Sequence, residues 1–116
     1  MLFAALAAAP VADAVSAFVT PKRVTYCKVD RAAGKLICWR PSNGFTARMT
    51  ASGKVAAGLV RANRGRYDSA PALVLAFGDT WTRGAWTCTS RKTGLICLNR
   101  KNHGWFFDKA HGYKQF

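Results

Sequence analysis

The stretch Cys27–Cys38, Cys-Lys-Val-Asp-Arg-Ala-Ala-Gly-Lys-Leu-Ile-Cys, has the pattern of a strand, a turn that ends in glycine, and a returning strand. A second stretch, Cys88–Cys97, reads Cys-Thr-Ser-Arg-Lys-Thr-Gly-Leu-Ile-Cys and repeats the Arg-x-x-Gly tip and the Leu-Ile-Cys return arm. The first stretch is one residue longer on each side, which leaves each cysteine opposite its partner. We therefore predict two β-hairpins, each closed by its own disulfide, Cys27–Cys38 and Cys88–Cys97.

The turns of the two hairpins are expected to differ. Opposed residues in a non-hydrogen-bonded antiparallel pair have Cα atoms about 4.5 Å apart, at the short end of what a disulfide spans. Identical four-residue turns would give the two cysteine pairs opposite hydrogen-bonding parities, so we predict four residues in one turn and two in the other. A four-cysteine zinc site is the alternative. Ten and eight residues separate the cysteines, whereas zinc motifs place ligands two to four residues apart.

The similarity between the two stretches continues after each second cysteine. Cys38 is followed by a polar loop and Gly44-Phe45, and Cys97 by a polar loop and Gly104-Trp105. Each half of the chain therefore runs hairpin, loop, Gly-aromatic. This pattern predicts a half-repeat, and chance similarity between two hairpins is the alternative.

The first residues have the pattern of an export signal. Leu2–Ala9 is an apolar run of eight residues, and small residues at positions 12 and 14, or at 15 and 17, form candidate cleavage sites. We predict a signal peptide over residues 1–17, cleaved after Ala14 or Ala17, and a single secreted β domain over 18–116. A buried N-terminal helix is the alternative, and Pro10 and Asp13 argue against a membrane span.

The charge balance narrows the function classes. The chain has 116 residues with 18 Lys and Arg against 5 acidic residues, so 18 − 5 gives +13. Loss of residues 1–14 would remove Asp13 and give 18 − 4, or +14. Such a protein is no acidic activator or inhibitor, and it is expected to contact polyanions. No Glu occurs, which excludes in practice the carboxylate pairs of glycoside hydrolases.

Short apolar or alternating segments, separated by glycine-rich turns, predict an all-β fold: a small disulfide-stapled antiparallel sandwich or barrel-like sheet. The expected strands are Val24–Val29, Lys35–Trp39, Phe45–Met49, Leu73–Phe77, Trp86–Thr89, Leu95–Leu98 and Trp105–Phe107. Val55–Val60 is ambiguous, and Asp108–Tyr113 is expected to form one helical turn. The expected core aromatics are Tyr26, Trp39, Phe77, Trp81, Trp86, Trp105 and Phe107.

Several of these segments together resemble a known family. Phe18-Val-Thr-Pro precedes Cys27, Phe77-Gly-Asp-Thr-Trp precedes Cys88, and Gly94-Leu-Ile-Cys-Leu-Asn is followed by Asn102-His-Gly-Trp-Phe. In these motifs residues 18–116 resemble small exported bacterial proteins catalogued as a domain of unknown function. Residues 21–25 depart from the family's opening pattern, and a second cysteine pair common in its middle is absent. The resemblance implies export and a common fold, and it implies no activity.

Basic residues are the candidate ligand-binding groups. They fall in the loops and at the two hairpin tips, where they could hold a polyanion: Arg31, Arg61, Arg64, Arg66, Arg91, Lys92, Arg100 and Lys101. If the hairpins lie side by side, their tips would form one positive edge, beside which Trp and Tyr could stack bases or sugars. A solvated basic surface without a specific ligand is the alternative.

We therefore expect a secreted, non-enzymatic binding or structural module that contacts anionic envelope polymers or an acidic lipid surface, with nucleic acid as a non-specific partner. We expect no catalytic residue, metal, cofactor or transmembrane span in the mature chain. One alternative is a secreted nuclease-like hydrolase in which His103 and His111 act as acid and base and Lys109 steadies the phosphate. Another is a protein-partner module, an inhibitor or effector.

Overall fold

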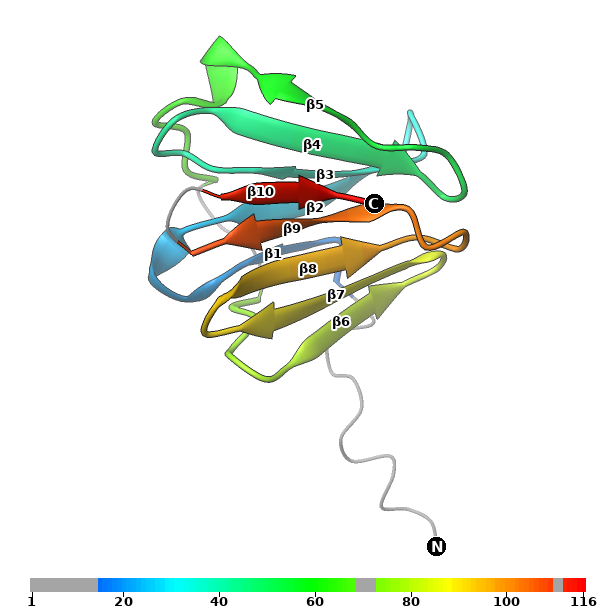
Figure 1. The fold of residues 1–116 in the computed structure, drawn as a ribbon. Helices are drawn as coiled ribbons and strands as arrows, with labels where there is room; N and C mark the ends of the chain where they lie inside the picture. The colour runs from blue at the N-terminus through cyan, green and yellow to red at the C-terminus, as the bar shows by residue number, and fades with distance from the viewer. Residues whose placement is uncertain (1–14, 69–72, 110–111) are drawn as a thin grey trace, which may run out of the picture.

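The computed structural model of the protein describes residues 15–68, 73–109 and 112–116. Ten strands form two five-stranded antiparallel sheets that pack face to face (Figure 1). Sheet one contains, in order, β1 (Ala17–Val19), β2 (Tyr26–Asp30), β3 (Lys35–Trp39), β4 (Phe45–Thr50) and β5 (Ala56–Leu59). Sheet two contains β6 (Thr80–Arg83), β7 (Trp86–Arg91), β8 (Gly94–Leu98), β9 (Gly104–Asp108) and β10 (Tyr113–Gln115). The predicted all-β fold is thus confirmed, as a sandwich and not a closed barrel.

Helical structure is confined, in the part of the chain that the structure describes, to two 3-10 turns, Pro21–Arg23 and Arg61–Asn63. None of the described segments is a helix with the length and apolar character needed to span a membrane.

Both predicted hairpins and both predicted disulfides are confirmed. Cys27 pairs with Cys38 across β2 and β3, and Cys88 pairs with Cys97 across β7 and β8, with Cα–Cα distances of 4.1 and 4.0 Å. The arms are equal: the first hairpin has a turn over residues 31–34, and the second has a turn over residues 92–93. The extra residues therefore lie in the turn, as the parity argument required, and not in the arms.

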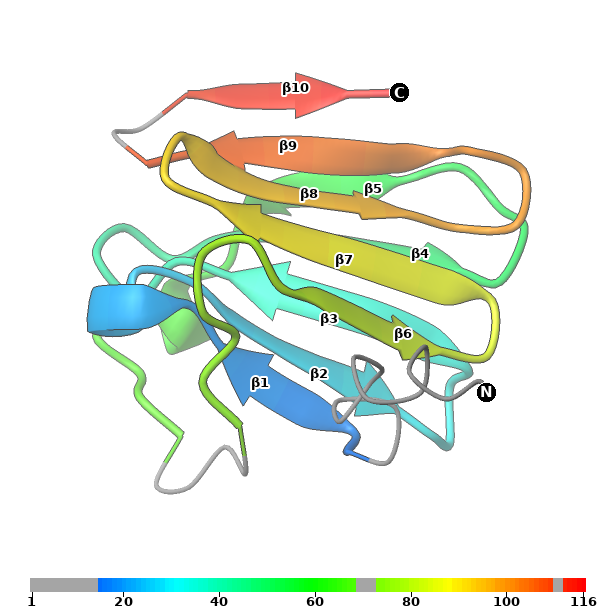
Figure 2. The same ribbon diagram turned by 90° about the horizontal axis from the view of Figure 1, so that it is seen from below.

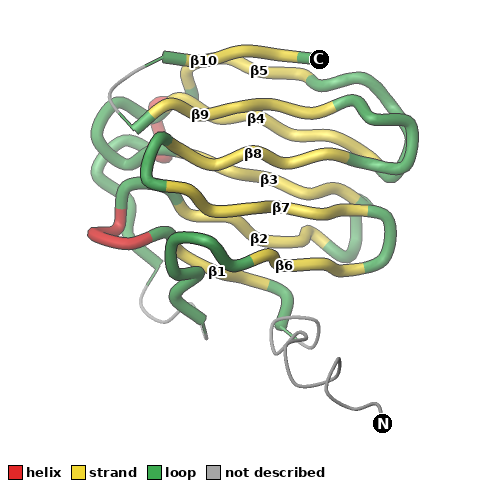
Figure 3. Tube along the Cα trace, turned by 60° about the horizontal axis from the view of Figure 1, so that its bottom comes forward, coloured by secondary structure: helices red, strands yellow, loops and turns green. Residues whose placement is uncertain are grey.

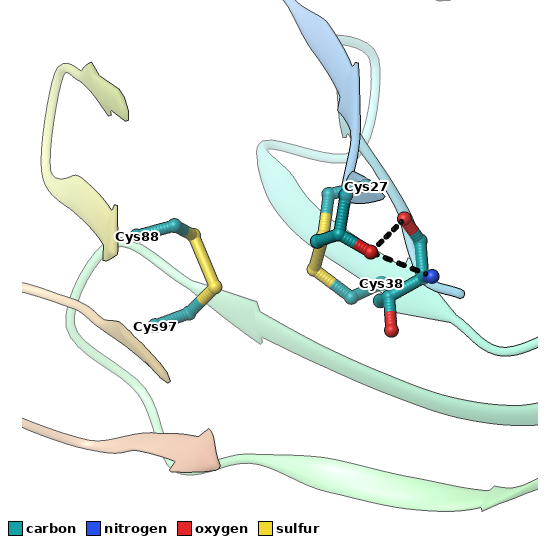
Figure 4. Close-up of a disulfide and its surroundings, with 6 residues drawn as sticks. Cys27, Cys38, Cys88 and Cys97 are labelled. Atoms are coloured by element: carbon teal, nitrogen blue, oxygen red, sulfur yellow. Dashed lines mark hydrogen bonds between the residues drawn. A yellow bond between two sulfur atoms is a disulfide. The ribbon is translucent and has the colours of Figure 1, made fainter. Parts of the chain in front are cut away.

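The two disulfides lie in the core between the sheets. The sulfur atoms of Cys27, Cys38 and Cys97 lie within 4.8 Å of one another, although they come from different sheets (Figure 4). Because successive strand residues point to opposite faces, the neighbours of each cysteine in its rung also face inward. Phe18 in β1 and Trp81 in β6 occupy equivalent positions beside the first cysteine of each sheet, and their ring centroids are 5.0 Å apart.

A smaller cluster covers the outer face of sheet one. Tyr26 and Trp39 form the rung next to the first disulfide, so they point away from the main core. Their rings stack at 5.6 Å, and the indole Nε1 of Trp39 donates to the carbonyl of Arg66. The segment around Arg66 therefore closes over this face and buries both aromatics.

The two halves of the chain have the same plan, which supports the half-repeat over chance similarity. Each sheet is a meander whose second and third strands carry the disulfide. Equivalent strands stack across the sandwich, from β1 with β6 to β5 with β10 (Figure 3). They run in opposite directions, so a pseudo-two-fold axis relates the halves, and the β2–β3 and β7–β8 turns lie at opposite ends (Figure 2).

Two local predictions were wrong. Leu73–Phe77 was expected as a buried strand, but it makes a single bridge, Val74 to Val19, at the edge of sheet one. Leu75 is buried, whereas its neighbour Val74 points to the uncovered face of the edge segment and is 59% exposed, and Phe77 lies in the turn that follows and is 47% exposed. Phe77 is therefore not a core aromatic; the other six expected ones are buried.

The expected helical turn over 108–113 is also replaced. β9 continues to Asp108 and β10 begins at Tyr113, with the Asp108 amide donating to the Gly112 carbonyl at 3.0 Å, so these strands form a hairpin. The predicted signal cleavage after Ala14 falls at the boundary of the described residues, and residues 1–14 lie outside them.

Candidate functional site

The predicted basic site residues are divided among three places. We call the end formed by residues 20–25, 40–44 and 92–93 the pocket end, and the end formed by 31–34, 84–85 and 99–103 the opposite end. The two hairpin tips do not lie side by side, so they do not form the single positive edge that was considered from the sequence. Arg91 and Lys92 lie at the pocket end, whereas Arg31, Arg100 and Lys101 lie at the opposite end.

The remaining three predicted residues, Arg61, Arg64 and Arg66, lie in the segment that covers the outer face of sheet one. Arg66 is committed there to structure, since its guanidinium lies 5.3 Å from the Trp39 ring centre and 3.6 Å from the Asp68 carboxylate. The Gly65 amide donates to the Pro41 carbonyl at 2.6 Å and the Val60 amide to the Gly44 carbonyl at 3.0 Å, so this group lies at the pocket end of sheet one, although none of its three residues lines the pocket.

A pocket of about 500 Å³ opens at the pocket end, between the 3-10 turn of sheet one and the β7–β8 turn of sheet two. Its volume falls within the range of about 300–1,000 Å³ typical of small-molecule sites. Its floor consists of the core residues Leu95 and Phe107, and Val24 and Phe77 form apolar walls that remain partly exposed. The pocket thus reaches from solvent to the main core.

The charged residues that line this pocket are all cationic. They are Lys22, Arg91, Lys92 and Lys109, and all four are exposed. No carboxylate is among the described lining residues; Asp79 and Asp108 neighbour them in the chain without lining the pocket. A concave surface with charges of one sign and low-dielectric walls concentrates the field, so an anion is attracted to this mouth.

The segment that carries Lys22 is conformationally strained. Lys22 and Arg23 both have positive φ, 63° and 57°, a region that costs non-glycine residues about 1–2 kcal/mol each. Thr20 holds the turn, because its hydroxyl accepts from the Thr25 amide at 3.0 Å and its carbonyl accepts from the Arg23 amide at 3.0 Å. Strained backbone of this kind clusters at functional sites. The turn places Lys22 on the pocket rim.

Sequence reasoning missed most of this site. Lys22, Val24 and Phe77 were not among the predicted ligand-binding residues, and Lys109 entered only as a possible phosphate ligand. These residues come from segments far apart in the chain, and no local pattern indicates that the segments meet.

A buried arginine lies behind the pocket floor. Arg40 follows β3 and is 3% exposed, and its guanidinium carbon is 5.0 Å from the centre of the Phe107 ring. It donates to the carbonyls of Asp108 and Gly112, at the β9–β10 connection, while its Nε finds no partner among the described residues. Burial lowers the pKa of this guanidinium, and the Asp108 carboxylate opposes the shift. Arg40 therefore fastens sheet one to sheet two.

The residues of the hydrolase alternative are not assembled by the described structure. His103 lies in the β8–β9 loop at the opposite end, and its amide donates to Asn99 Oδ1 at 3.1 Å. Lys109 lies at the pocket end, beyond the other terminus of β9. The five residues of β9 lie between them, so their Cα atoms are six strand steps, or about 20 Å, apart. His111 lies outside the described residues.

The clustered sulfurs are not ligands of a metal in this state, because each is consumed in a disulfide. A zinc site requires thiolates. The cysteines therefore serve the core of the fold.

The motif that carried the family resemblance also has structural duties. A Cβ on Gly104 would collide with the Cys97 carbonyl, so only glycine fits where β9 begins. Asn99 donates through Nδ2 to the carbonyls of Thr50 and Gly53, at 3.0 and 2.8 Å. Leu95 and Cys97 are core residues. This motif explains the fold and does not by itself mark a reaction centre.

No curated protein and no solved structure is significantly similar to the chain. A family model described as a family of unknown function, DUF6636, matches residues 37–114, from within β3 to within β10. The match includes both halves of the sandwich and agrees with the resemblance to a domain of unknown function. The chain belongs to this family, DUF6636.

Proposed function

We propose that the protein is an exported, non-enzymatic binding module that holds an anionic component of the cell envelope at its pocket end. The observation that carries this proposal is the pocket rim, where four cations converge and no described lining residue is acidic. The eight residues predicted from sequence contribute only Arg91 and Lys92 to this rim, and Lys22 and Lys109 join them.

Export is supported by the cysteines. Both disulfides are fully buried between the sheets, and disulfides of this kind persist in oxidising compartments, whereas cytosolic thiols are kept reduced. Together with the predicted signal peptide, they favour a location outside the cytoplasm, where the abundant polyanions are envelope polymers and acidic lipids.

The first test measures binding to phosphatidylglycerol vesicles, with phosphatidylcholine vesicles as the uncharged reference. Because release of counterions drives such binding, we expect affinity to fall at least about tenfold between about 50 and 200 mM salt. Affinity that is independent of salt, or equal for both vesicles, would contradict the proposal.

A matched pair of variants separates the pocket end from net charge. Lys92→Glu/Lys109→Glu alters two exposed rim residues, and Arg31→Glu/Lys101→Glu alters two exposed residues at the opposite end. Both variants change the net charge by the same amount. We expect the rim variant to lose at least about tenfold more affinity than the other. Equal losses would show that overall charge, and not this end, binds the anion.

A further inference from the structure

The pocket combines an apolar interior with a cationic rim. Its walls expose Val24 and Phe77 to solvent, 37% and 47% respectively, and its floor reaches the buried Leu95 and Phe107. Exposed apolar groups around a concavity indicate a binding site for an apolar group. A simple polyanion such as a sugar phosphate would leave this apolar interior unused.

The charged residues occupy a different part of the same pocket. Lys22, Arg91, Lys92 and Lys109 are exposed, whereas Leu95 and Phe107 are buried together with the lining residues Thr20, Thr25 and Ser90, so the charges lie at the mouth and an uncharged surface with an apolar floor lies at depth. A ligand that matches this order has an apolar chain with one anionic end. Ligand sites of this kind have mainly apolar walls and a few placed polar groups that set orientation.

We propose that the pocket binds the acyl chain of an acidic amphiphile, with its carboxylate or phosphate held by the cationic rim. The proposal rests on the proposed function and names the ligand class of the same site. The chain lies against Val24, Phe77 and Leu95, and the head group lies among Lys22, Lys92 and Lys109. The strained turn at Lys22 and Arg23 fixes the rim before binding, so little ordering is required when the ligand enters.

The experiment is a calorimetric titration of the purified protein with monomeric dodecanoate and, separately, with dodecyl phosphate. Dodecyltrimethylammonium has the same tail with a cationic head, and acetate has the same head without the tail. We expect saturable binding of one dodecanoate or dodecyl phosphate per chain, at least about tenfold tighter than either control. Equal binding of the cationic amphiphile would overturn the proposal, as would no binding of the two anionic ones.

Two aspartate variants locate the site. Phe77→Asp places a carboxylate in the pocket wall, and Leu59→Asp makes the same change of charge at a residue of β5 that is 75% exposed and does not line the pocket. Both side chains are exposed, so both variants are expected to fold, which circular dichroism checks. We expect Phe77→Asp to lower dodecanoate affinity at least about tenfold and Leu59→Asp to leave it unchanged. Equal effects would place the binding elsewhere and overturn the proposal.

The vesicle assay keeps the two proposals distinguishable. Salt-dependent binding to phosphatidylglycerol vesicles without binding of dodecanoate or dodecyl phosphate would retain the envelope function and overturn the acyl-chain site. Binding of free dodecanoate that the vesicles neither compete with nor reproduce would retain the pocket ligand as a soluble fatty acid and overturn the envelope function. Competition between dodecanoate and the vesicles would support both.

Discussion

In each half of the sandwich one side chain connects its sheet to the facing sheet, but the two side chains differ in charge. The residue two positions after the second cysteine of each hairpin, Arg40 in one half and Asn99 in the other, reaches across to the facing sheet. Arg40 binds carbonyls at the β9–β10 connection, and Asn99 binds the carbonyls of Thr50 and Gly53 between β4 and β5. The pseudo-symmetric positions therefore perform one task, with a charged group at the pocket end and a neutral group at the opposite end.

The difference shows how burial of a charged side chain weakens the contact between the sheets. Asn99 also accepts from the amides of Lys101 and His103, so its side chain is fully used. Arg40 is desolvated and its Nε has no partner among the described residues, so the two carbonyls, the Asp108 charge and the Phe107 ring compensate for its burial only in part. Burial of an incompletely paired charge is expensive. The contact between the sheets at the pocket end is therefore expected to be the weaker of the two.

The largest expected effect on stability comes from the disulfides, the feature that the two halves share most closely. Replacing either cysteine pair by alanine should lower the free energy of unfolding by about 3 kcal/mol, because a short loop is released and core volume is lost. The two loops have sequence separations of 11 and 9, so their entropic contributions differ by only a few tenths of a kcal/mol. Denaturant titration measures both; a large difference between the pairs would break the symmetry.

The next effect separates the two ties. Asn99→Leu should cost about 2–3 kcal/mol, because it leaves two carbonyls and two amides without their partner. Arg40→Met should cost only about 1 kcal/mol, because the lost carbonyl contacts are offset by removal of a desolvated charge. Denaturant titration again gives both values. A greater cost for Arg40→Met would mean that the charged tie is the stronger one.

A smaller effect concerns the residues that precede β1, the first strand of the first half. β1 is preceded by residues that the sandwich uses: the Val15 carbonyl accepts from Trp81 Nε1 at 3.1 Å, and the Ser16 carbonyl accepts from the Val29 amide at 2.8 Å. If the protein is exported as proposed, cleavage after Ala14 keeps both contacts and cleavage after Ala17 removes them, so we predict that the mature chain begins at Val15. Intact mass of the secreted chain tests this. Deletion of residues 15–17 should cost about 1–2 kcal/mol, and a natural start at Phe18 would contradict the prediction.

The smallest effect is a pH dependence at the closing strands. β10 carries Tyr113, packed on Phe45 and Phe107, whereas β5 begins with alanine. Burial raises the pKa of the Tyr113 phenol. The unfolded chain loses this proton first, so the contribution is present below about pH 10 and is lost as pH rises through the folded pKa. Tyr113→Phe should make the fall in unfolding free energy above pH ~10 shallower; an unchanged slope would exclude Tyr113 as its source.

Local structure was predictable because its causes are local. Cysteine pairing, the strand–turn–strand pattern and the unequal turns all follow from contacts between residues fewer than a dozen positions apart, at which period-two patterning and turn geometry suffice. The prediction of a buried strand at 73–77 was wrong because a continuous apolar run does not indicate whether one face or both faces of the segment will be covered. β10 was missed because Tyr113-Lys-Gln is too short and polar to show a period.

By itself the sequence determined the all-β class and the two disulfide hairpins with their unequal turns, and it indicated the repeated plan of the halves with chance similarity as the alternative. Only the tertiary structure decided that the halves face each other in opposite directions, which sends the two basic hairpin tips to opposite ends. It also brought Lys22, Phe77, Lys92 and Lys109 around one pocket. The physical reason is that hairpin register depends on neighbouring residues, whereas the pocket depends on how two complete sheets stack through their shared core.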